Sequence, residues 1–532
     1  MSQSRNRSRN QSQHQSRHRT TQEQTGTAGA PDPRRWWGLV VIALAQLMVV
    51  LDATIVNIAL PSAQRELHMS DANRQWVITA YTLAFGGLLL LGGRIADLVG
   101  RKRAFTVGLV GFAVASALGG AATGQGLLFG ARALQGVFAA LLAPSALSLL
   151  TTTFTDGKER GKAFGIYGAI AGGGSAIGLI AGGLLTEYLD WRWCLYVNVP
   201  IALIALVGAW VFLHDHRGHG GARLDVPGVL LGCGGLVAIV YGCSEAQPRG
   251  WGDGLVIGLL VGGAALLALF TWWQGRARYP LLPLHVVRDR NRAGAFLTMG
   301  LAVIAMFGMF LFMTYYLQVI LGYSPVKTGL AFLPMTVAII FGSTQISARL
   351  LHRLPPRVLM VPGTVLAAAG LFYLTFLTAE PAYVSHVLPA ELLVGLGMGL
   401  IFMPVMATAT SGVAPQDSGV TSATVNTAQQ VGGSIGTALL NTIATSTSAT
   451  YIGSHLANAA KEAGGRLTPG MREGVVKDGV VHGFTVAIGW GAGIMLLAAV
   501  VAGVMVNGKA SGRAPGAEAP GAAPEDAEAP TR

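Results

Sequence analysis

The sequence predicts an all-α polytopic membrane protein, and three observations support that prediction. Hydrophobic residues make up 52% of the chain and charged residues only 12%, about half of the ~25% charged share in a soluble domain. The hydrophobic residues lie in long continuous runs, which indicate transmembrane helices, whereas a β-barrel would show alternation. Glycine, at 73 of 532 residues, suits helices that pack closely within a bilayer.

Fourteen apolar segments are expected to cross the membrane as helices, each close to the ~20 residues that a span requires. The weakest of them is 226–243, and an odd number of spans would require one segment to be false. In chain order they are 37–60, 76–96, 104–122, 127–151, 163–185, 194–213, 226–243, 254–273, 294–318, 327–349, 358–378, 387–411, 419–445 and 483–506.

The remaining stretches are polar. Residues 1–36 are rich in Gln, Ser, Arg and His, and residues 507–532 are rich in Ala, Pro, Gly and Glu. Both compositions predict disordered tails. The charged stretch 446–482 is expected to form a long loop on the outer side.

The distribution of Lys and Arg predicts the orientation. The side that holds both tails carries about a threefold excess of these residues, so both termini are expected to be cytoplasmic in a plasma-membrane protein. The net charge of +12 does not favour nucleic-acid binding, because it is sorted by membrane side. RNA binding by the Arg-rich tail remains a minor alternative.

A faint internal repeat organises the helices into two halves. Three glycines and a Gly/Pro pair recur after about 258 to 260 residues, and paired halves are a common transporter plan. We therefore expect a six-helix bundle at 37–213, an inserted helix pair with its flanking loops at 214–293, and a second six-helix bundle at 294–506. The matched positions are Gly161 with Gly419, Gly174 with Gly432, Gly178 with Gly436, Gly136 with Gly395 and Pro144 with Pro404.

Two lone charges stand inside apolar segments. Asp52 lies in the first segment and Arg132 in the fourth, at comparable depths from the outer side. A charge within a span is costly and by default marks an ion or substrate path. We expect Asp52 and Arg132 to be electrostatically coupled in a central cavity, although a locked structural ion pair is the alternative. Glu391 matches Arg132 in the repeat and is a candidate second titratable group.

Residues 93–103 form a short basic hairpin between the second and third segments. Gly93 and Gly100 allow close helix approach, and the basic residues Arg101 and Lys102 hold the loop on the cytoplasmic side. Asp97 is a charge at a helix end that requires a partner. We expect this stretch to act as a cytoplasmic gate, with Asp97 paired to Arg101 or to a helix N-terminus.

Other residues are candidates for helix contact and for substrate binding. Gly174, Gly178 and Gly182 recur at intervals of four on one helix face, which suits close packing. Trp191 and Trp193 are expected in a membrane-interface belt. Six residues are considered for a substrate cavity, although plain packing is the favoured interpretation for most of the Met, Phe and Tyr residues: Asn57, Gln135, Met306, Phe310, Tyr315 and Gln318.

The 93–103 loop resembles the signature loop of the major facilitator superfamily, with Leu98 where that family often has arginine. The glycines at 174–182 resemble its antiporter motif, with Leu179 in place of a proline. The Asp52 segment, residues 191–200 and residues 315–325 add to this likeness. Over about residues 37–506 the chain resembles the fourteen-helix EmrB/QacA-type drug:proton antiporters. Its sequence also resembles those of actinobacterial proteins.

This resemblance implies two six-helix bundles plus two extra helices. It implies proton-coupled export of hydrophobic drugs or antibiotics by alternating access, without a cofactor. We expect a monomer. Export of an endogenous lipid or secondary metabolite is the near alternative, and a non-pumping channel or sensor is a more distant one.

Enzyme motifs do not compete with this interpretation. Residues 432–436 spell a hydrolase elbow, but within an apolar helix, and residues 503–510 only approximate a phosphate loop. Cys194, Cys233 and Cys243 lack metal-ligand spacing.

Overall fold

The computed structural model describes residues 34–69, 73, 76–154, 156–213, 224–379, 383–462 and 468–507, and this part of the chain forms helices without strands. The prediction of an all-α membrane protein is confirmed. The tails expected at 1–36 and 507–532 lie almost entirely outside the described residues.

The helices of the N-terminal half correspond to the first six expected segments, the sixth being broken near Val197. They are α2 (Arg35–Glu66), α4 (Trp76–Val99), α5 (Arg101–Gly120), α6 (Gln125–Thr153), α7 (Gly157–Tyr188), α8 (Trp193–Tyr196) and α9 (Asn198–Phe212).

The inserted pair and the C-terminal half follow. The pair consists of α10 (Val226–Arg249) and α11 (Gly254–Gln274), and the short α12 (Leu284–Arg288) leads into the second half. That half contains α13 (Arg290–Tyr315), η1 (Tyr316–Ile320), α14 (Pro325–Ala331), α15 (Leu333–Phe341), η2 (Gly342–Ser347), α16 (Ala348–Leu350), α17 (Pro356–Leu374), η3 (Tyr383–Val387), α18 (Leu388–Ala409), η4 (Pro415–Asp417), α19 (Ser418–Glu462) and α20 (Pro469–Met505).

Twelve stretches of the described helices are long and apolar enough to span a membrane, and each overlaps one of the fourteen expected segments. The weak segment 226–243 is among them, within Val226–Ala246. The segments expected at 163–185 and 419–445 fall on α7 and α19, which are outside that set of twelve. The count of fourteen spans therefore stays a prediction.

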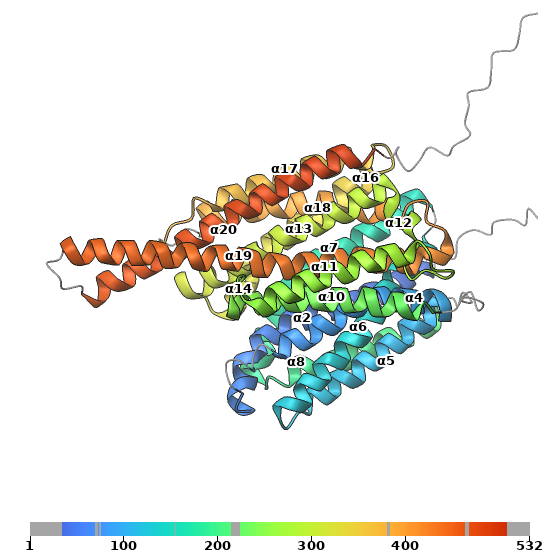
Figure 1. The fold of residues 1–532 in the computed structure, drawn as a ribbon, viewed down its shortest axis with the longest axis horizontal. Helices are drawn as coiled ribbons and strands as arrows, with labels where there is room; N and C mark the ends of the chain where they lie inside the picture. The colour runs from blue at the N-terminus through green and yellow to red at the C-terminus, as the bar shows by residue number, and fades with distance from the viewer. Residues whose placement is uncertain are drawn as a thin grey trace, which may run out of the picture.

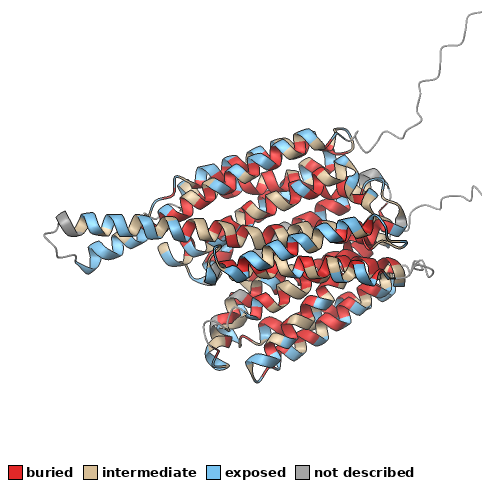
Figure 2. Cartoon of the chain, in the orientation of Figure 1, coloured by how far each residue is buried: buried red, intermediate tan, exposed pale blue. Residues whose placement is uncertain are grey.

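The stretch 446–482 differs from the expected loop. α19 continues to Glu462 and α20 begins at Pro469, so most of this stretch is helical. α19 has 45 residues, about 68 Å at 1.5 Å per residue, which is far longer than a bilayer core of ~30 Å requires. The two helices project together beyond the rest of the molecule as a largely exposed pair (Figure 1; Figure 2). This polar helical hairpin was not predicted from the sequence, because the hydropathy pattern indicates which segments are buried and not which polar segments form helices.

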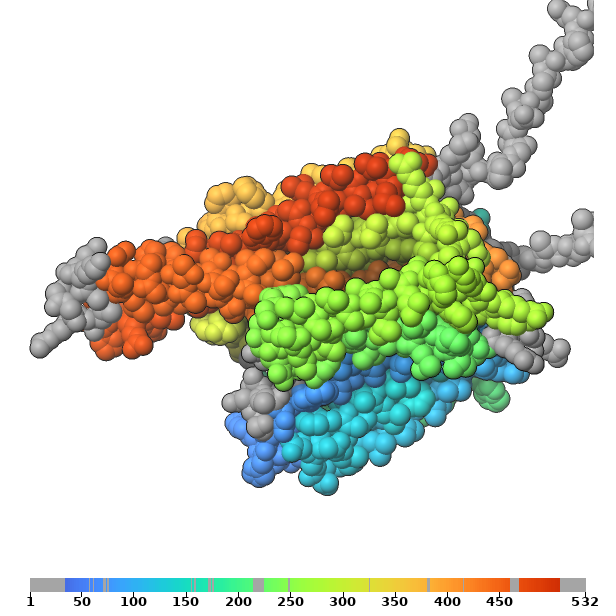
Figure 3. All heavy atoms as spheres, viewed as in Figure 1, coloured from blue at the N-terminus to red at the C-terminus, as the bar shows by residue number. Residues whose placement is uncertain are grey.

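The two halves meet along a seam that the inserted pair covers on one side. α19 of the C-terminal half contacts α4 and α6, while α7 of the N-terminal half contacts α14, α15 and α18. α10 packs on both α4 and α19, so it contacts one helix from each half. In the space-filling view the green inserted pair lies between the blue N-terminal helices and the orange and red C-terminal ones (Figure 3).

The matched glycines of the repeat make equivalent contacts in the two halves. A Cβ added at Gly136 on α6 would lie 2.5 Å from the carbonyl oxygen of Tyr81 on α4, and one added at Gly395 on α18 would lie 2.5 Å from that of Met335 on α15. Each glycine thus permits a close helix crossing that any side chain would block. The similarity supports two halves with a shared internal packing.

Candidate functional site

Asp52 and Arg132 form a fully buried ion pair. Asp52 lies in the middle of α2 with no exposed surface, and Arg132 lies on α6 with 1% of its surface exposed. The Arg132 Nη1 atom is 2.6 Å from Asp52 Oδ2. Two opposite charges attract each other strongly in the low-dielectric interior of a protein. Because each charge has also lost its hydration, the stability of the pair depends on further hydrogen bonds.

Those further hydrogen bonds come from Gln135, on the same helix as Arg132, and from residues on α5 and α9 of the N-terminal half. Gln135 Nε2 donates to Asp52 Oδ1 at 3.0 Å and to Ser116 Oγ at 2.6 Å, and Gln135 Oε1 accepts from Arg132 Nη1 at 2.9 Å. Asn198 Nδ2, at the start of α9, donates to Asp52 Oδ1 at 2.8 Å. The Asp52 carboxylate therefore receives three donors.

Arg132 is also fixed by α4. Its Nε donates to the carbonyl oxygen of Val77 at 3.1 Å, and its guanidinium carbon lies 4.4 Å from the centre of the Tyr81 ring. All these partners belong to residues 77–198. The pair thus lies inside the N-terminal bundle, whereas we expected it to line a central cavity between the halves.

The glycine face of α7 lies directly behind Asp52. A Cβ at Gly174 would meet Val50, one at Gly178 would meet the hydroxyl of Thr54, and one at Gly182 would meet Ile55. These α2 residues lie within one turn of Asp52 on either side. The close contact expected for these glycines is present, and it fixes the depth and rotation of the helix that carries Asp52.

Glu391, the repeat counterpart of Arg132, has very different surroundings. It lies in the first turn of α18, fully buried, and neither carboxylate oxygen has a hydrogen-bond partner in the described part of the chain. Gly432 and Gly436 of α19 pack on Gly300 and Ile304 of α13, as Gly174 and Gly178 pack on Val50 and Thr54. This correspondence places Ala302 where the N-terminal half has Asp52, so the second half offers no opposite charge at that place.

Asp97 joins the two halves at the end of the molecule that carries the α4–α5 connection. Its Oδ1 accepts from the backbone N–H of Gly419 at 3.0 Å and its Oδ2 from that of Val420 at 3.1 Å, at the N-terminus of α19. Arg101 Nη2 lies 3.8 Å from Asp97 Oδ1. Both partners that the sequence suggested, an arginine and a helix N-terminus, are therefore present.

The glycines and the lysine of this loop have structural roles that the contacts make clear. A Cβ at Gly93 would meet the carbonyl oxygen of Gly419 at 2.6 Å, so the two helices touch there. Gly100 has φ 108°, a conformation that favours glycine, where α4 ends and α5 begins. Lys102 Nζ donates to the carbonyl oxygens of Trp210 and Leu213 at the end of α9.

Two more contacts tie the halves together at this end. Ser148 Oγ on α6 lies 2.7 Å from Ser418 Oγ, beside the Asp97 contact. Arg160 on α7 donates to the hydroxyl and the carbonyl of Thr410, just after α18, at 2.6 and 3.1 Å. The molecule is closed between its halves at this end.

The residues considered for a substrate cavity do not gather in one place. Gln135 belongs to the ion-pair network, and the side chain of Asn57 lies outside the described residues. Met306 is buried, Phe310 packs on Phe332 and Tyr315 packs on Phe484 of α20. Gln318 lies half-buried in η1.

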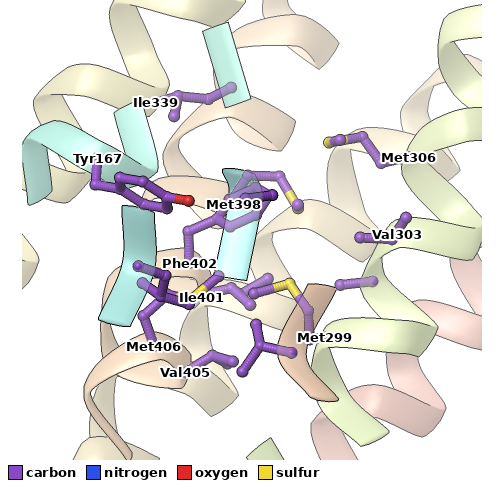
Figure 4. Packing of buried hydrophobic residues seen from close by; sticks show 14 of the residues in the cluster. Tyr167, Met299, Val303, Met306, Ile339, Met398, Ile401, Phe402, Val405 and Met406 are labelled. Carbon is purple, nitrogen blue, oxygen red and sulfur yellow. The ribbon is translucent and has the colours of Figure 1, made fainter. Parts of the chain in front are cut away.

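The contact between α7 and α18 supplies a different apolar surface. Figure 4 shows Tyr167 of α7 near Met398 and Phe402 of α18, with Met299 and Met406 around them. The Tyr167 hydroxyl donates to Gln46 Oε1 of α2 at 2.8 Å. Methionine side chains adapt readily to irregular partners, and Met299, Met398 and Met406 lie together at this contact.

Sequence reasoning missed part of the site. Asn198, Ser116 and Tyr81 were not identified, because single polar residues near helix ends are common. The expected interface belt is wrong for Trp191, which is 3% exposed and donates through its indole N–H to Glu66 Oε2, while Trp193 is 48% exposed. A tryptophan beside an ion pair was indistinguishable by sequence from one at the lipid surface.

Comparisons with known proteins agree with this architecture. Residues 42–437 match the family model described as Major Facilitator Superfamily. The chain is 57% identical over 488 residues to the puromycin resistance protein pur8 of Streptomyces alboniger, covering 91% of this chain and 94% of that one. It is 38% identical over 427 residues to the cephamycin export protein CmcT of Amycolatopsis lactamdurans, covering 79% and 88%.

A solved structure has the same fold. The human organic anion transporter MFSD10 (TETRAN) superposes with a TM-score of 0.59 at 13% identity, over 88% of this chain and 99% of that one. At so low an identity the likeness concerns the fold alone.

Proposed function

The chain belongs to the Major Facilitator Superfamily, whose members are membrane transporters and not enzymes, and on that premise we propose that it exports hydrophobic antibiotics across the plasma membrane in exchange for protons. Relatives named for puromycin resistance and cephamycin export support an antibiotic as the cargo. Both termini face the cytoplasm in this proposal, as the distribution of Lys and Arg suggests.

The observation that carries the proton part is the buried Asp52–Arg132 pair. A carboxylate inside a membrane helix, held by one cation and two amides, is a group whose protonation changes the local balance of charge. Protonated Asp52 attracts Arg132 less strongly, which frees α2 and α6 to change their packing. The glycine contact of α7 with α2 would transmit that change, because α7 packs directly on the C-terminal half.

The Asp97 contact supplies the conformational part. In the present structure Asp97 caps α19 across the seam, so the end that this proposal assigns to the cytoplasm is closed. Alternating access requires that one side be closed at a time. Proton binding from outside and cargo release to the outside would belong to states with this end closed. Opening requires the cap on Gly419 and Val420 to break.

The test is efflux driven by a pH gradient. Purified protein in proteoliposomes, with puromycin as the probe, should expel the drug when an inward proton gradient is imposed. Asp52→Asn should abolish gradient-driven movement while the protein remains in the membrane. Gradient-driven efflux by Asp52→Asn at the wild-type rate would refute the proton role of Asp52.

A second variant separates coupling from folding. Asp52→Asn leaves Arg132 as an unpaired buried charge, which costs about 3–5 kcal/mol. The double variant Asp52→Asn/Arg132→Gln removes both charges and should regain much of that stability but no coupling. Recovery of gradient-driven efflux in the double variant would show that the single variant failed only through misfolding.

A further inference from the structure

A narrow apolar crevice reaches the buried ion pair from the far end of α2. Its volume is about 10 Å³, close to the space that one water molecule needs. α2 lines it with Val56, Ala59 and Ala63, which follow each other along one helix face, and α6 lines it with Leu128 and Arg132. Arg132 is the charged residue among the lining residues, so the crevice ends at the pair.

Trp191 also lines this crevice, and two charged residues hold it there. Its indole Nε1 donates to Glu66 Oε2 at 2.6 Å, and Arg192 Nη1 lies 2.5 Å from Glu66 Oε1. The Arg192 guanidinium also lies over the Trp191 ring, 4.6 Å from its centre. Glu66 ends α2 one turn beyond Ala63, so the cluster lies at the mouth of the crevice.

Arg192 is itself tied to two neighbouring elements. Its Nη2 donates to the carbonyl oxygen of Ala122, just after α5, at 3.0 Å, and its Nη1 lies 3.8 Å from Asp190 Oδ1. Glu66 is 48% and Arg192 24% exposed at their side chains, while Trp191 beneath them is buried. The cluster thus faces solvent on one side and covers the apolar crevice on the other.

From these contacts we propose that the crevice is the route by which protons reach the Asp52–Arg132 pair from outside, and that Glu66 and Arg192 hold Trp191 as the latch that closes it. The latch is closed in the present structure. Displacement of the Trp191 ring would widen this crevice, which now has room for about one water molecule, and would connect Arg132 to the outer solvent. This inference rests on the proposed proton coupling and adds the path and the gate.

Thiol labelling in intact cells tests the latch. The three native cysteines are replaced by alanine, and Ala63→Cys places a small reporter on the crevice wall. A charged, membrane-impermeant methanethiosulfonate reagent is then added outside. Glu66→Ala should raise the labelling rate of the reporter about tenfold, the factor that corresponds to 1.4 kcal/mol. Arg192→Gln should act in the same direction.

The matched control is Glu187→Ala. Glu187 is an exposed acid at the same end of the N-terminal half, on α7, and its removal should leave the labelling of Ala63→Cys unchanged. Equal labelling rates with and without Glu66, in variants present at equal amounts in the membrane, would overturn the latch. A rise caused equally by Glu187→Ala would do the same, because it would reflect general loosening.

Transport measurements test the path. Labelled Ala63→Cys should lose gradient-driven puromycin efflux by more than about tenfold but keep substrate–substrate exchange, which requires no net proton entry. Labelling of Leu189→Cys, which is 60% exposed in the native chain, should leave both intact. Full gradient-driven efflux by labelled Ala63→Cys would overturn the path. If the unlabelled wild type shows no gradient-driven efflux, the proposed function is wrong. The labelling rates of Ala63→Cys still test the latch in that case.

Discussion

The ion pair of the N-terminal half and Glu391 of the C-terminal half occupy matched places in two similarly packed bundles, but their surroundings differ. Asp52 receives donors from Arg132, Gln135 and Asn198. Glu391 is equally buried and lacks a hydrogen-bond partner within the described residues. Burying a carboxylate without a hydrogen-bond partner is costly. The N-terminal half therefore fixes the Asp52 carboxylate with three hydrogen-bond donors, whereas the C-terminal half buries the Glu391 carboxylate without one among the described residues.

The largest expected effect is a difference between Asp52 and Glu391 in how much each contributes to the free energy of unfolding. Asp52→Leu leaves Arg132 buried and unpaired, so the free energy of unfolding should fall by about 3–5 kcal/mol. Glu391→Met removes a group that already lacks a partner, and should change that free energy by less than about 1 kcal/mol or raise it. Denaturant unfolding in detergent micelles measures both. A large loss from Glu391→Met would mean that Glu391 has a partner in the folded protein.

Gate variants come next. Asp97→Asn removes the charge that caps α19 and should weaken closure by about 0.5–2 kcal/mol, as other N-terminal caps do. Opening should appear as faster labelling of a cysteine placed at Ser148, beside the gate, from the cytoplasmic side. Arg160→Gln disturbs the matching contact with Thr410 on the other side of the seam, and should act in the same direction but less, since no helix N-terminus is left uncapped. Slower labelling in Asp97→Asn would contradict the gate.

Substitutions in the glycine faces of α7 and α19 test how similarly the two halves are packed. A Cβ at Gly436 would meet the backbone carbonyl of Ile304, which cannot move without its helix, whereas one at Gly178 would first meet the Thr54 hydroxyl. Gly436→Ala should therefore cost more stability than Gly178→Ala, each within the ~1–3 kcal/mol of overpacked cores. Gly178→Ala should instead mainly lower efflux, because it displaces the turn next to Asp52. The reverse order in unfolding experiments would contradict this account.

The smallest effect concerns Glu66 and pH. Hydrogen bonds from Trp191 and then from Arg192 hold the pKa of Glu66 below its ordinary value of 4.5. A lowered pKa in the folded state means that this stabilisation is present above the unfolded-state pKa and is lost as the pH falls through the folded-state value. Unfolding followed between about pH 3 and 6 should show a shallower loss of stability on acidification in Glu66→Gln than in wild type.

Much of the architecture and part of the site could be predicted from the sequence. Asp52 and Arg132 stood out because an isolated charge in an apolar run has few tolerable environments, and the expected pairing is present. Asp97 was identifiable for the same reason, together with its two partners. The glycine spacing on α7 predicted a close helix contact, and the structure identifies α2 as the partner.

The remainder depended on tertiary contacts that local pattern does not encode. Gln135 lies one turn from Arg132, so its place in the network could have been inferred from helical spacing, but Asn198 is some 146 residues from Asp52. The role of Trp191 required Glu66 to be its neighbour. The helical continuation of α19 to Glu462 was hidden because its residues are polar and its stability comes from packing on α20.

Substrate-induced proton release tests the central claim, the coupling of cargo to Asp52, most directly. Puromycin added to the purified protein in weakly buffered detergent solution should release protons from the wild type, because a cargo that competes with the proton must displace it. Asp52→Asn should bind the drug and release none. Equal proton release from Asp52→Asn and wild type would contradict the account and would assign the proton to another group.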